Sequence, residues 1–341
     1  MTFIPASGTR PDRAAPATAT WQDYLRIARL DHATKHVFIV PGIVLAVLLR
    51  GDAATEVGAT LGLNVLIGFM AAIGVASANY VINEWLDRDF DRFHPEKSQR
   101  AAVQREMDPR VVIAEYVALM AVGLALAALV NPAFFVSTAL LGLSGITYNV
   151  RPIRSKDRAY ADVLSESLNN PIRLMMGWAM VDAGTLPPAS LLLAFWFGGA
   201  FLMNAKRLSE YRDIAASDGT AVLHLYRRSF RFYDENKLAV ANLTYALLCA
   251  FFVAIFLIKY RIEYVLLFPC IVAMFGVYYA LSLVPGSVAR KPEKLFRAKP
   301  VMIAALGTAV VFALTTVVDI PALDELTSQR FIVIADAAAA R

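Results

Sequence analysis

Cysteine is nearly absent from this chain: only Cys249 and Cys270 occur among its 341 residues, and both lie inside apolar runs. Two isolated cysteines form no disulfide framework, and their spacing matches no zinc-binding pattern. Residues 1–20 lack the apolar core of a secretory signal peptide, so we expect a disordered N-terminal tail there. No segment between the apolar runs is long enough for a nucleic-acid-reading domain, so nucleic acid is not expected as a partner.

Apolar residues, by contrast, are abundant. They make up 58% of the chain, the mean hydropathy is +0.53, and several runs approach the roughly 20 residues that cross a bilayer as a helix. Because alternating barrel strands are missing, the composition predicts an all-α polytopic membrane protein. We expect nine transmembrane helices, at about residues 37–50, 59–82, 111–130, 133–150, 160–181, 187–205, 239–258, 263–284 and 301–318.

Positive charge is distributed unevenly between the predicted loops. Most of the 33 lysines and arginines fall in alternate connecting segments, although the net charge is only +5. The positive-inside rule therefore predicts a multi-pass protein of the cytoplasmic membrane, with the N-terminus and the basic loops in the cytoplasm. Such one-sided charge also favours contact with anionic membrane lipids. The expected organisation is a transmembrane catalytic domain over residues 21–320 and a C-terminal tail over residues 321–341, and a homo-oligomer is compatible with it.

The end of the second predicted span carries the most informative motif. Asn83, Asp87 and Asp91 follow at intervals of four residues, so they share one face of a helix, and Asn79 extends that face by one turn. Carboxylates at a membrane border are costly and usually functional. One or two carboxylates suit Mg²⁺, which completes its coordination with phosphate oxygens and water. The motif predicts a magnesium site, whose ligands would be Asn83, Glu84, Asp87 and Asp91. The alternative is a solvated acidic helix end.

Two further groups of polar residues lie on the same side of the membrane. Cations that could hold phosphate oxygens follow the acidic motif, and more lie at the end of the sixth span. The residues expected to bind phosphate groups there are His94, Lys97, Arg100, Lys206, Arg207 and, as their acidic neighbour, Glu210. An ordinary topology signal explains the same charges equally well.

The fifth predicted span is unusually polar. Asp162, Glu166, Asn169 or Asn170, and Arg173 recur at helical spacing, so this stripe must face a bundle interior or a wet cavity. An internal network in which Glu166 pairs with Arg173 or Arg151 is the alternative. Other candidate substrate-binding residues are Asn79, Tyr148, Arg151 and Arg154, together with Lys35 before the first span.

With this motif and topology, the chain resembles the UbiA-type intramembrane prenyltransferase superfamily over roughly residues 22–320. The string N-E-x-x-D-x-x-x-D at Asn83–Asp91 is similar to the first acidic motif of that superfamily, with Glu84 in place of the usual Asp. Most members carry a second acidic motif after the sixth span. Here that place reads Lys206-Arg207-Leu208-Ser209-Glu210, which resembles the branch typified by decaprenyl-phosphate phosphoribosyltransferases.

The match to that branch has departures. His94-Pro95-Glu96-Lys97 matches its H-P-x-K-R-x-R-P string, but Ser98 and Ala101 replace the expected Arg and Pro. Its string before the first span is matched only at Arg29 and Lys35. These departures affect the region that would hold phosphate groups, so the donor or the lipid could differ.

The resemblance implies a Mg-dependent membrane transferase that moves a phosphoribosyl group from phosphoribosyl pyrophosphate to a polyprenyl phosphate and releases pyrophosphate. Asp87, Asp91 and Asn83 would be the catalytic residues. Lys206, Arg207, Lys97 and His94 would bind the donor, and Lys35, Arg151 and Arg154 the lipid phosphate. The first alternative is prenyl transfer from a prenyl diphosphate to an aromatic or other acceptor. The second is a transporter, although the charged residues cluster at one side of the membrane.

Overall fold

The computed structural model describes residues 17–52, 55, 58–94, 96–217, 219–284 and 298–327, apart from the side chains of residues 32–35, 59 and 326. These residues are helical, with one isolated bridge between Thr18 and Glu106 and no strand. The N-terminal half contains η1 (Leu30–Ile39), α1 (Trp21–Ile27), α2 (Val40–Leu49), α4 (Leu61–Asp91), α5 (Ala101–Gln104), α6 (Pro109–Val130) and α7 (Pro132–Asn149). The remainder contains α8 (Ala161–Ser167), α9 (Asn169–Ala179), α10 (Ala189–Ser217), α11 (Gly219–Tyr226), α12 (Glu235–Tyr260), η6 (Ile262–Leu266), α13 (Leu267–Ser282), α14 (Lys299–Val317) and α15 (Pro321–Thr327).

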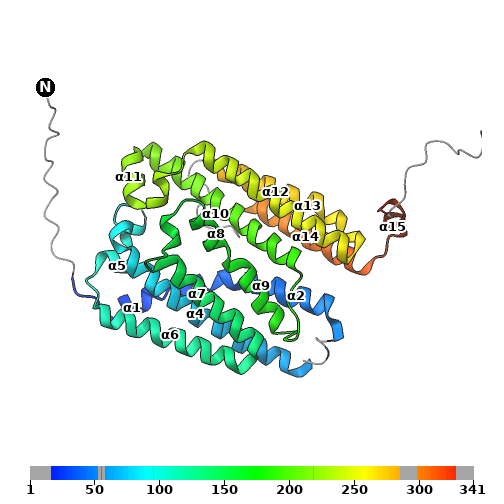
Figure 1. The fold of residues 1–341 in the computed structure, drawn as a ribbon, viewed down its shortest axis with the longest axis horizontal. Coiled ribbons are helices and arrows are strands. Elements are labelled where there is room, and N and C mark those ends of the chain that lie inside the picture. The colour runs from blue at the N-terminus through cyan, green and yellow to red at the C-terminus, as the bar shows by residue number, and fades with distance from the viewer. Residues whose placement is uncertain are drawn as a thin grey trace, which may run out of the picture.

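The helices form one bundle with two sides (Figure 1). On one side α4 packs along α6 and α7, and α9 packs on α7 and α2; on the other, α10 packs along α12, and α13 along α14. The α8 and α9 helices both contact α10 and so connect the two sides. Short helices α5 and α11 lie at the same end of the bundle.

Local sequence explains where several helices begin. Pro109 and Pro132 occupy first helical positions, where the missing N–H costs nothing because it would have no partner. The preceding residues cap these helices: Asp108 accepts from the N–H of Arg110 at 2.8 Å, and Asn131 accepts from the N–H of Phe134 at 2.8 Å. The helix starts are thus set by capping chemistry that is visible in the sequence.

The expected count of nine membrane spans is not confirmed. All nine predicted segments contain helical residues, but in the described part of the chain only six helices are long and apolar enough to cross a membrane: α4, α6, α10, α12, the continuous pair η6 and α13, and α14. The fifth predicted span is two short helices, because α8 ends at Ser167 and α9 begins at Asn169. Pro171 lies just after this break and has no N–H to donate to the preceding turn.

The first predicted span also falls short. Its apolar helix runs only from His36 to Leu49 and begins as a 3₁₀ segment. It is held by close contact with α9, because a Cβ atom on Gly42 would lie 2.2 Å from the Leu174 carbonyl oxygen, and one on Gly177 would lie 2.1 Å from the Ile39 carbonyl oxygen. Only glycine permits the two backbones to approach this closely.

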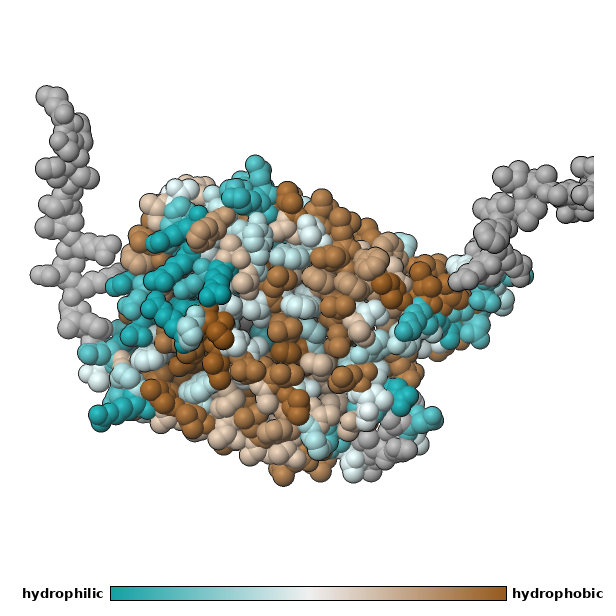
Figure 2. All heavy atoms as spheres, in the orientation of Figure 1, coloured by the Kyte–Doolittle hydropathy of each residue, from teal (hydrophilic) through white to brown (hydrophobic). Residues whose placement is uncertain are grey.

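The surface separates into an apolar region and a polar end. Figure 2 shows hydrophobic residues over the middle of the bundle and hydrophilic ones gathered near α5 and α11. Large apolar side chains are exposed on several helices, including Leu129 at 69% and Ile303 at 71%. Such extensive apolar exposure is expected of a surface in contact with lipid and would be a liability in water. The side of the membrane that the polar end faces stays a prediction.

We expect Gly177→Ala to destabilise the bundle, because the new methyl group would clash with the backbone of the neighbouring helix. Overpacking of this kind typically costs about 1–3 kcal/mol. The control is Gly276→Ala in α13, where a Cβ atom meets nothing within 4 Å, so the change should be neutral or mildly stabilising. Thermal unfolding in detergent measures both; equal Tm values for the two variants would contradict the close packing of α2 on α9.

Candidate active site

A polar cavity of about 400 Å³ lies at the polar end of the bundle, between α4, α8, α10 and the segment after α4. It brings together most of the residues singled out in the sequence. Those that line it are Asn83, Glu84, Asp87, His94, Lys97, Arg100, Tyr148, Glu166, Lys206, Arg207 and Glu210.

The remaining predicted residues lie elsewhere. Asp91 and Arg154 are buried beside this cavity and line a small adjoining space with Asp87. Asp162 is fully buried behind the cavity wall. Arg151 is exposed and lines neither this cavity nor the apolar one described below. The side chain of Lys35 lies outside the described residues.

Asp87, a carboxylate of the α4 motif, lines the polar cavity and is paired with two cations. Its Oδ1 lies 2.8 Å from Nη2 of Arg154 and 2.6 Å from Nζ of Lys156. Both cations come from the loop after α7 and are held there by Asn149, whose carbonyl oxygen accepts from Arg154 at 2.9 Å and whose Oδ1 accepts from Lys156 at 2.6 Å. The loop thus fixes the position of the Asp87 carboxylate and compensates its charge in a buried place.

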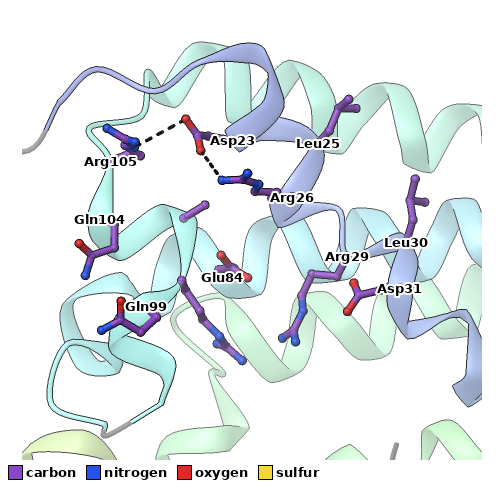
Figure 3. A pocket seen from close by; sticks show the side chains of 12 residues that line it. Asp23, Leu25, Arg26, Arg29, Leu30, Asp31, Glu84, Gln99, Gln104 and Arg105 are labelled. Carbon is purple, nitrogen blue, oxygen red and sulfur yellow. Dashed lines mark hydrogen bonds and ion pairs between the residues drawn. The ribbon is translucent and has the colours of Figure 1, made fainter.

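The other two carboxylates of the motif have different neighbours. Oδ2 of Asp91 accepts from Nη1 of Arg100 at 2.5 Å. Glu84 lines both the polar cavity and an outer pocket of about 800 Å³, and Arg29 and Arg100 line both of them as well. Figure 3 shows this outer pocket, with Glu84 and Arg29 across from Asp23. The residues of the motif therefore face different spaces. Asn83 and Asp87, one turn apart on α4, line the polar cavity, whereas Glu84 lines the outer pocket as well.

His94 and Lys97 form one corner of the cavity. Nδ1 of His94 accepts from the backbone N–H groups of Glu96 and Lys97, each at 3.1 Å, and burial lowers the pKa of His94 to about 3, so the ring is neutral. Nζ of Lys97 donates to the hydroxyl of Tyr226 and lies 4.6 Å from the centre of its ring. Burial also lowers the pKa of Lys97 to about 8. The His94 turn thereby orders the backbone at the point where Lys97 enters the cavity.

Arg207, another residue of the cavity wall, lies close to three carboxylates. Its guanidinium lies 2.8 Å from Oε2 of Glu166, 3.0 Å from Oε2 of Glu210 and 3.6 Å from Oδ2 of Asp162. The expected alternative, a network in which Glu166 pairs with Arg173 or Arg151, differs from the described contacts, in which Glu166 pairs with Arg207 and accepts from the hydroxyl of Tyr148 at 2.9 Å. Arg207 is therefore a structural centre of the site as well as a wall residue.

Beside the polar cavity lies an apolar cavity of about 410 Å³. The two cavities share five wall residues, namely Tyr80, Asn83, Tyr148, Glu166 and Lys206. Aliphatic side chains of η1 and α14, among them Val37 and Met302, line the apolar cavity together with Asn79. A molecule with a charged head and an apolar tail would match this pair of cavities, because each part would meet the environment it prefers.

The acidic motif fits Mg²⁺ only as a site completed by a substrate. In the described part of the chain no group of three or more acidic, histidine or cysteine side chains is arranged to hold a metal by itself. Asn83 and Asp87 both face the polar cavity, and Mg²⁺ is commonly bound by one or two carboxylates plus substrate phosphates. The donor set therefore fits a magnesium ion that arrives with a diphosphate.

Several residues that lie in or beside the wall of the polar cavity were not singled out as site residues in the sequence. Arg227 lies 3.3 Å from Asp162 and donates to the hydroxyl of Tyr148 at 2.9 Å, and Tyr226 binds Lys97. Tyr226 is the last residue of α11, and Arg227 directly follows this helix. Arg29 and Tyr80 also line the polar cavity. Their positions depend on which helices pack together, and no local pattern indicates that.

We expect pyrophosphate binding to weaken as the pH rises through about 8, because the pKa of Lys97 is lowered to about 8 and its positive charge is lost above that value. Titration of inorganic pyrophosphate with Mg²⁺ at several pH values measures this. The control is Lys97→Arg, whose side chain stays charged, so the decline should be smaller. A wild-type affinity that is constant between about pH 7 and about pH 9 would contradict the assignment of Lys97 to phosphate binding.

Arg207→Met should strongly destabilise the protein, because three carboxylates would lose a buried partner. Breaking a buried ion pair from one side typically costs about 3–5 kcal/mol. The matched control on the same helix is Arg212→Met, which removes an exposed pair with Glu235 and should cost about 1 kcal/mol or less. Unfolding in detergent measures both, and a similar loss in the two variants would show that Arg207 is not a structural centre.

Comparison with known proteins agrees with this fold. The model of the UbiA prenyltransferase family matches residues 39–315. A protoheme IX farnesyltransferase of Alkalihalophilus pseudofirmus is 27% identical over 235 residues, which are 66% of this chain and 73% of that protein. The nodulation protein NoeC of Azorhizobium caulinodans is 28% identical over 226 residues, which are 66% of this chain and 68% of that protein.

Solved structures share the fold. A UbiA homolog from Archaeoglobus fulgidus bound to DMAPP and Mg²⁺ matches with a TM-score of 0.64 at 22% identity, covering 87% of this chain and 100% of that one. A structure described for digeranylgeranylglyceryl phosphate synthase matches with a TM-score of 0.57 at 16% identity, over 86% of this chain and 96% of that one. Since the family model matches most of its residues, this chain belongs to the UbiA prenyltransferase family.

Proposed function

We propose that the protein is a membrane prenyltransferase that moves a prenyl group from a prenyl diphosphate to a second substrate. The observation that carries this proposal is the junction of the polar cavity, lined by Asn83, Asp87 and several cations, with the apolar cavity. A prenyl diphosphate has the matching division into a charged head and an apolar tail. The family and the named farnesyltransferase relative support the same donor class.

The diphosphate would lie in the polar cavity. Lys97 and Lys206 line it from two elements and can contact phosphate oxygens as point charges. Magnesium held by Asn83 and Asp87, with Glu84 and Asp91 near it on α4, would neutralise charge on the leaving diphosphate. This metal assignment is supported by the solved homologs that are bound to Mg²⁺ with DMAPP or GPP.

The reaction breaks the bond between the first prenyl carbon and the diphosphate oxygen, and the electron pair leaves with the diphosphate. The acceptor atom then forms a bond to that carbon and gives up its proton. Arg154 and Lys156 hold Asp87 in place for this step. The bond between the prenyl carbon and the diphosphate would break beside the residues that line both cavities, such as Asn83 and Tyr148. The head and the tail of the donor would meet there.

Phosphoribosyl transfer to a polyprenyl phosphate is the second candidate, and one observation favours it. On α10, Lys206, Arg207 and Glu210 occupy the wall where a second acidic motif would be expected, and the only carboxylate there is paired with Arg207. Direct cations suit a sugar phosphate and a lipid monophosphate. The named relatives support prenyl transfer better, so phosphoribosyl pyrophosphate is the second donor to be tested.

Asp87→Asn should reduce transfer by about 100-fold or more, because the Mg-bound leaving group loses a carboxylate ligand. The measurement is transfer of label from farnesyl diphosphate or from phosphoribosyl pyrophosphate, with Mg²⁺, in a lipid extract that supplies acceptors. Asp89→Asn is the matched control, since Asp89 is on the same helix but exposed and paired only with Arg92 in the described contacts.

Label that moves from farnesyl diphosphate, and is lost in Asp87→Asn but not in Asp89→Asn, would support prenyl transfer. Label that moves only from phosphoribosyl pyrophosphate would replace it with the second candidate. Equal activity of both variants and wild type would remove the α4 motif from the chemistry.

A further inference from the structure

Arg173 lies deep in the bundle and has no role in the reaction described above. It is on α9, its relative exposure is 7%, and it lines the apolar cavity. Its neighbours in sequence, Ile172 and Leu174, are buried apolar residues of two core clusters. A permanently charged guanidinium is therefore placed in a mainly apolar environment.

The described residues provide this guanidinium with no carboxylate. Its Nε atom is buried without a hydrogen-bond partner, and no ion pair to Arg173 occurs among the described side chains. Glu166 lines the same cavity, but it is paired with Arg207 at 2.8 Å and accepts a hydrogen bond from the Tyr148 hydroxyl. A buried charge without a partner costs several kcal/mol, so such residues are rare and usually have a function.

Arg173 lines the cavity that adjoins the proposed position of the donor's diphosphate. The apolar cavity that it lines also has Asn83 and Lys206 in its wall, and both of these also line the polar cavity. The wall also carries uncharged amide groups, among them Asn79 and Asn169, and one carboxylate, Glu166, which is paired with Arg207. Within the described lining, Arg173 and Lys206 are the cations, and Lys206 belongs to the diphosphate side.

We propose that Arg173 binds an anionic group of the acceptor, a carboxylate or a phosphate, inside the apolar cavity. The guanidinium would form a charge-assisted, two-pronged contact with that group and hold the rest of the acceptor toward the shared wall. This inference rests on the proposed function and adds the substrate class to it: an acceptor that combines an apolar body with one negative charge. Arg173 is thus a specificity-determining residue and takes no part in bond breaking.

The test uses three probes with the same tail, octanoate, octyl phosphate and octanol, and the purified full-length chain in nanodiscs. Mg²⁺ and inorganic pyrophosphate are kept saturating, so that the cations of the polar cavity are occupied. Binding is measured by calorimetry for wild type, Arg173→Met and Arg173→Lys. A charged hydrogen bond contributes about 1.5–3 kcal/mol, so an anionic probe should bind wild type about 10- to 100-fold more tightly than octanol.

Arg173→Met should lose this preference, and Arg173→Lys should keep part of it. Arg92→Met is the matched control, because Arg92 is exposed on the surface after α4, and it should bind the probes as wild type does. Stronger binding of octyl phosphate would indicate a lipid phosphate, and stronger binding of octanoate a carboxylate acceptor. A preference that survives in Arg173→Met, or is missing from wild type, would overturn the inference.

Stability separates a ligand-binding arginine from a structural one. Met has a similar length and no charge, so the Tm of Arg173→Met without probe should equal or exceed that of wild type. A clearly lower Tm would mean that protein groups hold Arg173 and would overturn the inference. The pyrophosphate titration is read separately: if it fails in wild type, the proposed function fails, whereas its success with no anion preference rejects only the role of Arg173.

Discussion

The polar end of this membrane protein depends on the mutual compensation of buried charges, and Arg207 is at its centre. Its guanidinium contacts carboxylates of Asp162, Glu166 and Glu210, which come from α8 and α10. Arg227, from the segment after α11, adds a second cation beside Asp162. Burying any one of these groups alone would be costly. Together they connect three separate segments and give the cavity a charged but balanced wall.

The same constraint explains how α4 is used. Its apolar part packs in the bundle, and its last turns carry the acidic motif into the polar end. Asp87 is stabilised there by Arg154 and Lys156 from a loop far along the chain. A carboxylate that is held by two cations is ordered before any ligand arrives, and preorganised charge is the main means by which enzymes stabilise developing charge.

The two adjoining cavities match the two parts of a substrate that has a charged head and an apolar tail. Lys97 and Lys206 lie where a diphosphate would be neutralised, while α14 and η1 supply apolar walls for a tail. Arg173 departs from this division, because it puts a charge where apolar surface would be expected. The family membership accounts for the division and leaves Arg173 unexplained, which makes its acceptor-binding role the more informative hypothesis.

Hydropathy and helical spacing are local properties, so the amino-acid sequence was sufficient to predict an all-helical membrane protein whose motif residues cluster at one end. Which charges pair with one another depends on the packing of the folded chain. Asp87 pairs with Arg154, 67 residues away, and Glu166 with Arg207, 41 residues away. In the folded chain the fifth predicted span is also broken between α8 and α9. Partner choice depends on the packing of distant helices, and a pattern of spacing within one helix carries no information about it.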